Sequence, residues 1–372
     1  MTRHLARTAS ALALAAATTT AGAGAASATD LIYGTHIPSS HIIADAAVVP
    51  FFDAVKEATG GEVTITPQWA GAVAKEGAIP GAIEGGLIDI GFMADVYAAA
   101  DFPNSVLITS IVMGGTDNRV MTGVASEIRM IDCEGCDEEL AAFDAFLLSS
   151  SSLPPQYLMC KEPFKTLDDL KGRKVRSTGA LARVVAKWGM TPVSLPTSDA
   201  YESLERGQVD CTTGIETFMQ DYAWWDSVKY VLDLPLGTYH GVLNLMSKPK
   251  FDSLPESARE AILGLQARMT ADTAFAYYTE TKSVRGKAET DHGVTYVPAG
   301  DDFVEAKAAF ARDEVPEAVA NGTKRGAKDA EGKAARLAEL TEKWTAIVAE
   351  TGEDKAAFEA ALDREVYSKL GR

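Results

Sequence analysis

The sequence has few of the residues on which metal and nucleophilic chemistry depend. Its 372 residues include only five histidines and four cysteines. It contains no G-x-S-x-G, no H-E-x-x-H and no phosphate-binding loop. The histidines lack clear acid partners, and His36 and His41, five residues apart, match no metal-ligand spacing. We therefore predict neither a cofactor nor a metal, and an exported hydrolase is the less favoured functional class.

The sequence also lacks an excess of basic residues, since its formal net charge is −17. Residues 1–28 hold two arginines and no acid, so the rest of the chain has 35 − 2 = 33 basic residues against 52 acidic ones, or −19. Nucleic acid and anionic lipid bind to basic patches, so this balance argues against both partners. An anionic ligand can bind only where local cations outweigh the overall charge.

After its first residues the chain has no apolar run of membrane length. Residues 1–28 have the three parts of a secretory signal, in which Arg3 and Arg7 precede the apolar run 9–17 and a small-x-small cleavage site at 26–28. We therefore predict that the protein is exported and that the mature chain is not embedded in the membrane.

The four cysteines of an exported chain are most simply structural disulfides. Cys133 and Cys136 form a C-x-x-C pair that could also be half of a zinc site or a redox motif, but Cys160 and Cys211 are isolated in the sequence. Three pairings are possible. Cys160 and Cys211 each lie near the end of a predicted short strand, so a bond between them is plausible.

The length suggests two domains, and the residue pattern predicts an α/β fold. Residues 31–93 and 174–212 each alternate strand and helix signals as β-α-β-α-β, which indicates parallel sheets. Ligands in such sheets bind beyond the carboxyl ends of the strands. Arg176 ends a predicted strand at that edge, where its guanidinium fits a carboxylate with two parallel hydrogen bonds. The alternative is a surface arginine paired with an acidic loop.

Three stretches resemble a known family. They are L-K-G-R-K-V-R from residue 170, P-V-S-L-P-T-S-D-A-Y-E-S-L-E-R-G-Q-V-D from residue 192, and V-K-Y-V from residue 228. Together they are similar to the solute-binding proteins of tripartite ATP-independent periplasmic (TRAP) transporters, the dicarboxylate-binding-protein family. The resemblance extends from about Asp30 to about Thr290 and is strongest between Leu167 and Val231.

The resemblance implies a periplasmic binding protein with two lobes, a mixed or parallel sheet in each, crossover strands and a long helix spanning both. We expect residues 29–153 and 241–283 in the first lobe and 154–240 and 284–372 in the second. Helical patterns are predicted over 137–146, over 256–285 as the spanning helix, and over 303–319, 331–350 and 354–370, which are expected to pack on the second sheet. The serine- and proline-rich residues 147–155 are expected to be a crossover.

The resemblance also implies the ligand contacts. Arg176 takes the place of the family's carboxylate-clamping arginine, and the cleft is expected to include the candidates His36, Trp69, Asp95, Tyr97, Gln156, Thr213, Phe218 and Trp224. Each of five candidates has a structural alternative: a loop or capping role for His36, a packed loop anchor for Trp69, a helix cap for Asp95, and a hydrophobic seam for Phe218 and Trp224. We favour the structural alternative for all of these except Trp69, where the two interpretations are balanced.

The ligand class stays open within organic acids. Many family members carry a second arginine near the position of Gln156, and this departure argues for a ligand unlike sialic acid or succinate. A monocarboxylate with a second polar or cationic group fits Arg176 and Asp95, whereas a dicarboxylate is typical of the family, and aromatic, hydroxy and keto acids are further alternatives. The expected partners are TRAP permease subunits or, alternatively, a sensor kinase, and a monomer is the default expectation.

Overall fold

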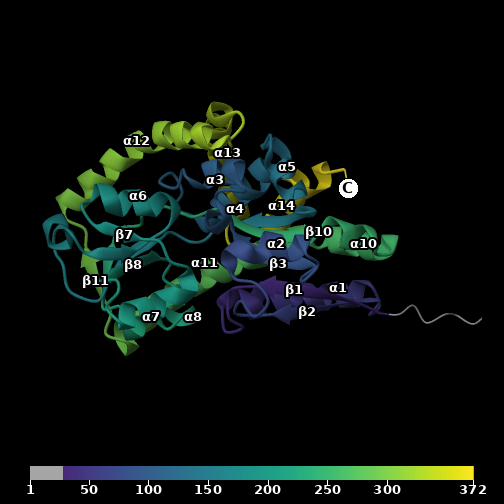
Figure 1. Ribbon diagram of the computed structural model, residues 1–372, viewed down its shortest axis with the longest axis horizontal. Coiled ribbons are helices and arrows are strands. Elements are labelled where there is room, and N and C mark those ends of the chain that lie inside the picture. The colour runs from purple at the N-terminus through teal and green to yellow at the C-terminus, as the bar shows by residue number, and fades with distance from the viewer. Residues whose placement is uncertain (1–27, 372) are drawn as a thin grey trace, which may run out of the picture.

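The chain folds into two α/β lobes, each built on its own sheet (Figure 1). The computed structural model describes residues 28–371, so the predicted export signal lies outside the described residues except for Ala28. Within those residues, no helix is both long and apolar enough to cross a bilayer. The predicted fold class, two lobes with a mixed sheet in each, is confirmed.

The first sheet has the strand order β2-β1-β3-β10-β4. Strand β1 pairs in parallel with β2 and β3, as the alternating pattern of residues 31–93 predicts, and β10 is antiparallel to both β3 and β4. Since β10 follows all of β5 to β9 in sequence, the chain builds most of the second sheet before it returns to the first. The strands are β1 (Thr29–Thr35), β2 (Val63–Gln68), β3 (Ile90–Ala94), β4 (Ala145–Ser151) and β10 (Val242–Ser247).

Strand β4 corrects two of the predictions. The helix expected over residues 137–146 ends at Ala141, and part of the expected crossover 147–155 belongs to the strand. Every residue of β4 except Phe146 is buried. A strand that is covered on both faces shows no alternation of polar and apolar residues, and the run Ser149 to Ser152 has the composition of a linker.

The second sheet has the strand order β11-β9-β5-β8-β6-β7. Strand β5 runs antiparallel to both of its neighbours, whereas the other pairings are parallel. The strands are β5 (Tyr157–Cys160), β6 (Lys174–Arg176), β7 (Thr191–Val193), β8 (Cys211–Gly214), β9 (Tyr230–Asp233) and β11 (Thr295–Pro298). The order places β6, which ends at Arg176, beside β8.

The helices cover the sheets and connect the lobes. They are α1 (Val49–Ala58), α2 (Ile79–Glu84), α3 (Pro103–Thr109), α4 (Asn118–Glu127), α5 (Cys136–Ala141), α6 (Gly179–Lys187), α7 (Ala200–Glu205), α8 (Phe218–Asp221), α9 (Lys248–Asp252), α10 (Glu256–Gly264), α11 (Gln266–Asp291), α12 (Asp301–Arg325), α13 (Ala330–Thr351) and α14 (Lys355–Glu365).

The prediction that the closing helices pack on the second sheet is wrong for α13 and α14. These helices pack against α4 and α11, and their apolar residues, including Trp344 and Phe358, belong to the core of the first lobe. Helix α13 can approach α4 closely because Gly123 has no side chain there; a Cβ on Gly123 would lie 2.1 Å from the Trp344 ring. The first lobe therefore holds more of the C-terminal region than we predicted.

Two chain crossings lie side by side between the lobes. Residues 153–156 and 236–239 form an antiparallel ribbon, in which the Leu153 amide donates to the Tyr239 carbonyl at 2.8 Å and the Gln156 amide donates to the Gly237 carbonyl at 2.9 Å. Gly237 has a φ of +91°, and a Cβ there would lie 2.2 Å from the Val112 carbonyl oxygen. The ribbon therefore requires glycine at this position.

Two helices also bridge the lobes (Figure 1). The predicted spanning helix is divided at Leu265 into α10 and α11, and α11 contacts α4 and α14 in the first lobe and α8 in the second. Helix α12 contacts α3 in the first lobe and α6 in the second. The lobes are thus connected by the ribbon, α11 and α12.

Both pairs of cysteines form disulfides, Cys133 with Cys136 and Cys160 with Cys211. Cys160 and Cys211 face each other across β5 and β8 and are fully buried. The plausible pairing of these two is therefore confirmed. Their bond closes a chain separation of 51 residues, against three for Cys133 and Cys136.

We expect the two disulfides to differ in their contribution to stability. In the loop-entropy description, the bond that closes the longer loop restricts the unfolded chain more. Replacing Cys160 and Cys211 with alanine should lower the free energy of unfolding by about 4 kcal/mol, and replacing Cys133 and Cys136 by about 2 kcal/mol. Urea titration of both double variants checks this, and an equal or larger loss for the Cys133/Cys136 variant would contradict it.

Candidate functional site

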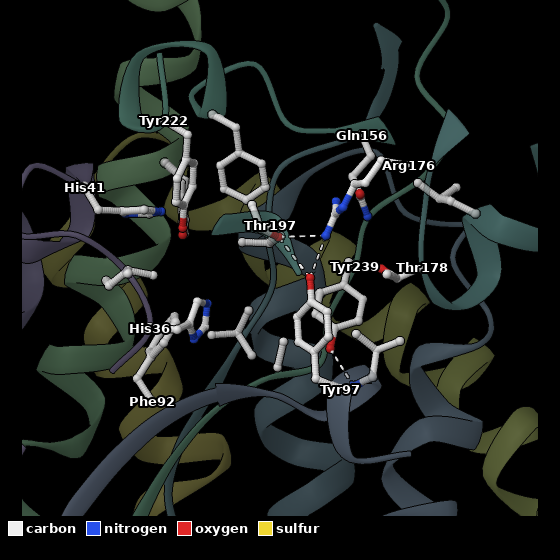
Figure 2. Close-up of a pocket in the computed structure, with 18 of the residues that line it drawn as sticks. His36, His41, Phe92, Tyr97, Gln156, Arg176, Thr178, Thr197, Tyr222 and Tyr239 are labelled. Atoms are coloured by element: carbon white, nitrogen blue, oxygen red, sulfur yellow. Dashed lines mark hydrogen bonds between the residues drawn. The ribbon is translucent and has the colours of Figure 1, made fainter. Parts of the chain in front are cut away.

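A pocket lies between the lobes, lined by residues of both (Figure 2). Its volume is about 60 Å³. A water needs about 10–15 Å³ of such a cavity, so the pocket has room for roughly four to six waters or a small organic molecule. The first lobe contributes His36, Phe92 and Tyr97 among others, and the second contributes residues that include Arg176 and Thr197.

Arg176 is the last residue of β6 and is only 3% exposed. Its guanidinium donates four hydrogen bonds, all to uncharged acceptors. They are Nε to the Leu195 carbonyl at 2.9 Å, Nη1 to the Thr213 carbonyl at 3.3 Å, and Nη2 to the Thr197 hydroxyl at 3.0 Å and the Tyr97 hydroxyl at 2.6 Å.

The charge of Arg176 has no counterion within residues 28–371, because no carboxylate of these residues forms an ion pair with it. Removing a charge from water costs several kcal/mol unless an opposite charge compensates. The guanidinium is therefore held in place by neutral acceptors at a pocket wall, where an anion can bind.

Tyr97 connects the two lobes at this point. It lies in a short 3-10 turn, Asp95–Ala98, directly after β3 of the first lobe. Its hydroxyl contacts Nη2 of Arg176 and, at 3.0 Å, the Thr197 hydroxyl, both in the second lobe. The hydroxyl therefore closes the pocket over the guanidinium (Figure 2).

Figure 2 shows His36, His41 and Tyr222 on the side of the pocket away from Arg176. The His41 ring lies edge-on to the rings of Phe218, Tyr222 and Tyr277, with centroid distances of 5.8–6.1 Å. Its Nδ1 accepts from the Ile43 amide at 3.4 Å, and its Nε2 lies 3.5 Å from Oδ2 of Asp221. The prediction that the histidines lack acid partners is thus wrong for His41, because Asp221 comes from α8, far away in the sequence.

Burial keeps these histidines neutral. It lowers the pKa of His41 to about 3 and the pKa of His36 to about 4, although the attraction of Glu76 partly opposes the change at His36. Burial likewise raises the pKa of Asp221 to about 7. Near neutral pH His36 and His41 therefore offer uncharged hydrogen-bonding groups on this side of the pocket, whereas the opposite side carries the positive charge of Arg176.

Five of the predicted site residues line the pocket: Arg176, Gln156, His36, Tyr97 and Phe218. The interpretation that we favoured for His36, a loop or capping role alone, does not account for this position. For Phe218 both interpretations hold, since it lines the pocket and also packs on the Trp224 ring at 5.3 Å. That these residues contact a ligand stays a prediction.

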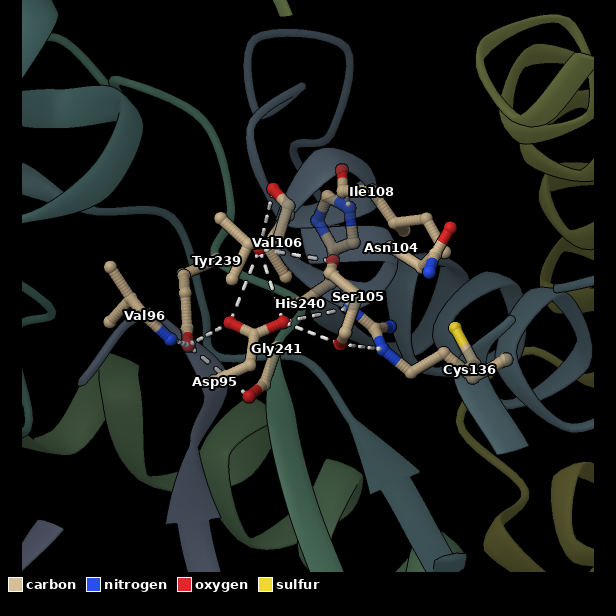
Figure 3. Close-up of polar contacts among 12 residues, drawn as sticks. Asp95, Val96, Asn104, Ser105, Val106, Ile108, Cys136, Tyr239, His240 and Gly241 are labelled. Carbon is tan, nitrogen blue, oxygen red and sulfur yellow. Dashed lines mark hydrogen bonds and ion pairs between the residues drawn. The ribbon is translucent and has the colours of Figure 1, made fainter. Parts of the chain in front are cut away.

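Asp95 lies outside the pocket lining, in a buried polar cluster (Figure 3). It is 0% exposed and accepts hydrogen bonds from Ser105 at 2.7 Å, Thr109 at 3.2 Å and Tyr239 at 2.7 Å. Nη2 of Arg129 lies 3.5 Å away. All of these contacts are with side chains and none caps a backbone amide of the turn, so the favoured interpretation as a helix cap is wrong. Because its oxygens are already used, Asp95 instead fixes the hydroxyl of Tyr239, which lines the pocket.

The other three predicted residues also lie outside the pocket lining. Trp69 packs edge-on against Tyr33 with the ring centroids 6.1 Å apart, as a loop anchor does. Trp224 is fully buried in the aromatic seam, whereas its neighbour Trp225 stacks on His292. The Thr213 hydroxyl bonds to Ser177, and only its carbonyl reaches Arg176.

Sequence reasoning missed Thr197 and Tyr239 as site residues. Thr197 follows Pro196 at the entry to α7, within the stretch P-T-S-D that carries the family resemblance, so a closer reading could have found it. Tyr239 lies in the returning ribbon, where no local pattern indicates a pocket. Among residues 28–371, no group of three or more potential ligand side chains is arranged to hold a metal.

Two α/β lobes that enclose a pocket with a buried arginine side chain are the architecture of a solute-binding protein. The sequence profile of the family described as "Bacterial extracellular solute-binding protein, family 7" matches residues 155–315. The resemblance to TRAP solute-binding proteins is therefore confirmed, and the family and its structural neighbours are binding proteins rather than enzymes. Because TRAP solute-binding proteins are periplasmic, the confirmed resemblance agrees with the predicted compartment.

One curated relative is the monocarboxylate 2-oxoacid-binding periplasmic protein of Nostoc sp.. It is 25% identical over 191 residues, which are 46% of this chain and only half of the relative's length.

Solved structures match more of the chain. A TRAP solute-binding protein of Bordetella bronchiseptica with bound mandelate has a TM-score of 0.74 and covers 85% of this chain and 99% of its own. One from Rhodoferax ferrireducens with benzoate has a TM-score of 0.76 and covers 86% and 99%. Both are 18% identical to this chain, so they show the shared fold.

The raised pKa of Asp221 predicts a pH dependence of stability. Folded Asp221 keeps its proton up to about pH 7, whereas a carboxyl in the unfolded chain ionises near pH 4. Between these values the folded protein binds more protons, so this contribution to stability is complete below about pH 4 and is lost as the pH rises to about 7. Urea titrations from pH 4 to pH 8 should therefore show the wild type losing stability relative to Asp221→Asn across that interval. Parallel profiles would contradict this assignment.

Proposed function

We propose that this protein is a periplasmic receptor that captures a small organic monocarboxylate between its lobes and delivers it to a TRAP-type membrane permease. The observation that carries the proposal is the buried guanidinium of Arg176, which has no counterion within residues 28–371 and faces an inter-lobe pocket. A carboxylate supplies the missing negative charge, and a guanidinium has five N–H donors, one more than the four hydrogen bonds of Arg176 use. The carboxylates bound by the relatives support this ligand class.

A single carboxylate suits the pocket better than two. Arg176 is the one cationic side chain among the pocket-lining residues, and Gln156 offers only a neutral amide. His36 and His41 are uncharged near neutral pH because burial lowers the pKa of each. A second carboxylate would therefore be buried without a counterion, which costs several kcal/mol.

Binding is coupled to closure of the lobes through Tyr97. Its hydroxyl reaches Arg176 and Thr197 only when the lobes are together. A carboxylate at Arg176 adds further contacts that exist only in the closed form and so shifts the population toward that form. The permease then recognises the closed protein, and the export signal predicted at residues 1–28 places it in the periplasm.

The role of Arg176 is tested by ligand binding to the purified exported protein. We expect a thermal-shift screen of monocarboxylates to identify acids that raise the melting temperature, and Arg176→Ala to weaken their binding by about 100-fold or more, since hydrogen bonds to charged groups contribute about 1.5–3 kcal/mol each. Arg173→Ala is the matched control, because Arg173 lies outside the pocket lining and bonds only to local carbonyls. Equal binding by the wild type and Arg176→Ala would overturn the proposal.

The role of Tyr97 is tested by Tyr97→Phe, which removes the hydroxyl but keeps the ring. Because one net hydrogen bond contributes about 0.5–1.5 kcal/mol, the dissociation constant should rise about 3- to 10-fold as the closed form loses a bond. Tyr278→Phe, which removes a hydroxyl bound to Glu353 away from the pocket, should leave the dissociation constant unchanged. Unchanged or tighter binding by Tyr97→Phe, measured by calorimetry, would contradict this role.

A further inference from the structure

The pocket contains a buried polar atom that the protein leaves without a partner. Nδ1 of His36 forms no hydrogen bond within the described residues, although the side chain is only 8% exposed and lines the pocket. A buried polar atom that stays unsatisfied costs about 1–3 kcal/mol. In a ligand pocket this atom indicates a place where a ligand group completes the hydrogen bond.

A second polar group lies on the same side of the pocket. The hydroxyl of Tyr222 lines the pocket, and Figure 2 shows no hydrogen bond from it to any other residue drawn there. His36 lies with Tyr222 on the side away from Arg176 and Gln156 (Figure 2). The lining also includes apolar residues such as Phe92, Leu181 and Val242. The pocket therefore has a charged end at Arg176 and a polar, uncharged end at His36 and Tyr222.

We propose that the ligand carries one neutral hydrogen-bonding group, a hydroxyl or a carbonyl, at the end opposite its carboxylate, and that this group binds at His36 and Tyr222. The inference rests on the proposed function, because it assumes that a carboxylate occupies Arg176. It goes further by defining the other end of the ligand and the two residues that select it.

The charge of the surroundings excludes a second carboxylate at this end. A neutral imidazole both donates and accepts, and burial keeps the pKa of His36 near 4. The buried carboxyl of Glu76, 2% exposed, is close enough to His36 to act on its titration. A second carboxylate would meet no cation here and would be repelled by Glu76, whereas a hydroxyl can both donate and accept without a charge to compensate.

The test compares acids that differ only at this end. The purified exported protein is titrated by calorimetry with benzoate, 3-hydroxybenzoate, 4-hydroxybenzoate and 3-carboxybenzoate, and with pentanoate and 4-oxopentanoate. In the wild type we expect at least one hydroxyl or keto acid to bind about 5- to 20-fold more tightly than its plain parent acid, as one or two net hydrogen bonds provide. We expect 3-carboxybenzoate to bind more weakly than 3-hydroxybenzoate.

Variants of His36 show which residue produces the preference. His36→Phe keeps a ring beside Phe92 but removes both nitrogens. The ratio of the dissociation constant of the plain acid to that of its hydroxyl or keto analogue should therefore fall toward one. His36→Asn keeps a polar atom near the position of Nδ1 and should retain part of the ratio. His292→Phe, the same substitution in a histidine outside the pocket lining, should keep the wild-type ratio. Because each variant is assessed by the ratio of its own two dissociation constants, a substitution that weakens the binding of both acids equally does not change the readout.

The other possible outcomes contradict either this inference alone or the proposed function as well. If the plain acids bind and neither hydroxyl nor keto group improves binding, or if His36→Phe keeps the full preference, this inference is wrong and the carboxylate receptor stands. If no acid of this set or of the broader monocarboxylate screen binds the wild type, the proposed function is wrong and the inference falls with it.

Discussion

The interaction on which this structure depends is a buried guanidinium held entirely by neutral oxygens. Its acceptors come from the loop after β7, from β8 and from Tyr97 of the opposite lobe, so the position of Arg176 is fixed by elements distant in sequence. A lysine could not bond in all these directions at once, because only arginine presents a rigid planar fork. The second sheet orients this fork, and the first lobe covers it.

The two walls of the pocket differ in how firmly they are held. Asp95 is buried with Arg129 and bonded to Ser105, Thr109 and Tyr239, so it connects the pocket-lining residue Tyr239 to the helices of the first lobe (Figure 3). A buried polar network whose members are bonded to one another is rigid. On the far side, His36 retains an unsatisfied nitrogen. The fold thus holds the hydroxyl of Tyr239 by hydrogen bonds on one side of the pocket and leaves Nδ1 of His36 without a partner on the other.

Local patterns predicted much of the fold and only part of the site. The β-α-β-α-β signals identified the parallel strands and placed β6 at its observed bounds, Lys174–Arg176, because turn glycines and apolar runs are local features. Strand β4 was missed because a fully buried strand shows no alternation. The bond of Asp95 to Tyr239 and the pairing of His41 with Asp221 could not be predicted, since each joins residues more than 140 positions apart. The charged end of the pocket could therefore be predicted from the sequence. Its neutral end could not, because it depends on contacts that form only in the folded chain.

Three connections join the lobes: the ribbon of residues 153–156 and 236–239, helix α11 and helix α12. Because the two lobes are connected at three separate places, they can tilt toward each other, but twisting and sliding of one lobe against the other are restricted. In the receptor proposed above, opening and closing change the spacing between the outer faces of the lobes while each face keeps its own shape. The permease of that proposal can distinguish the occupied from the empty form by this spacing, without contacting the ligand.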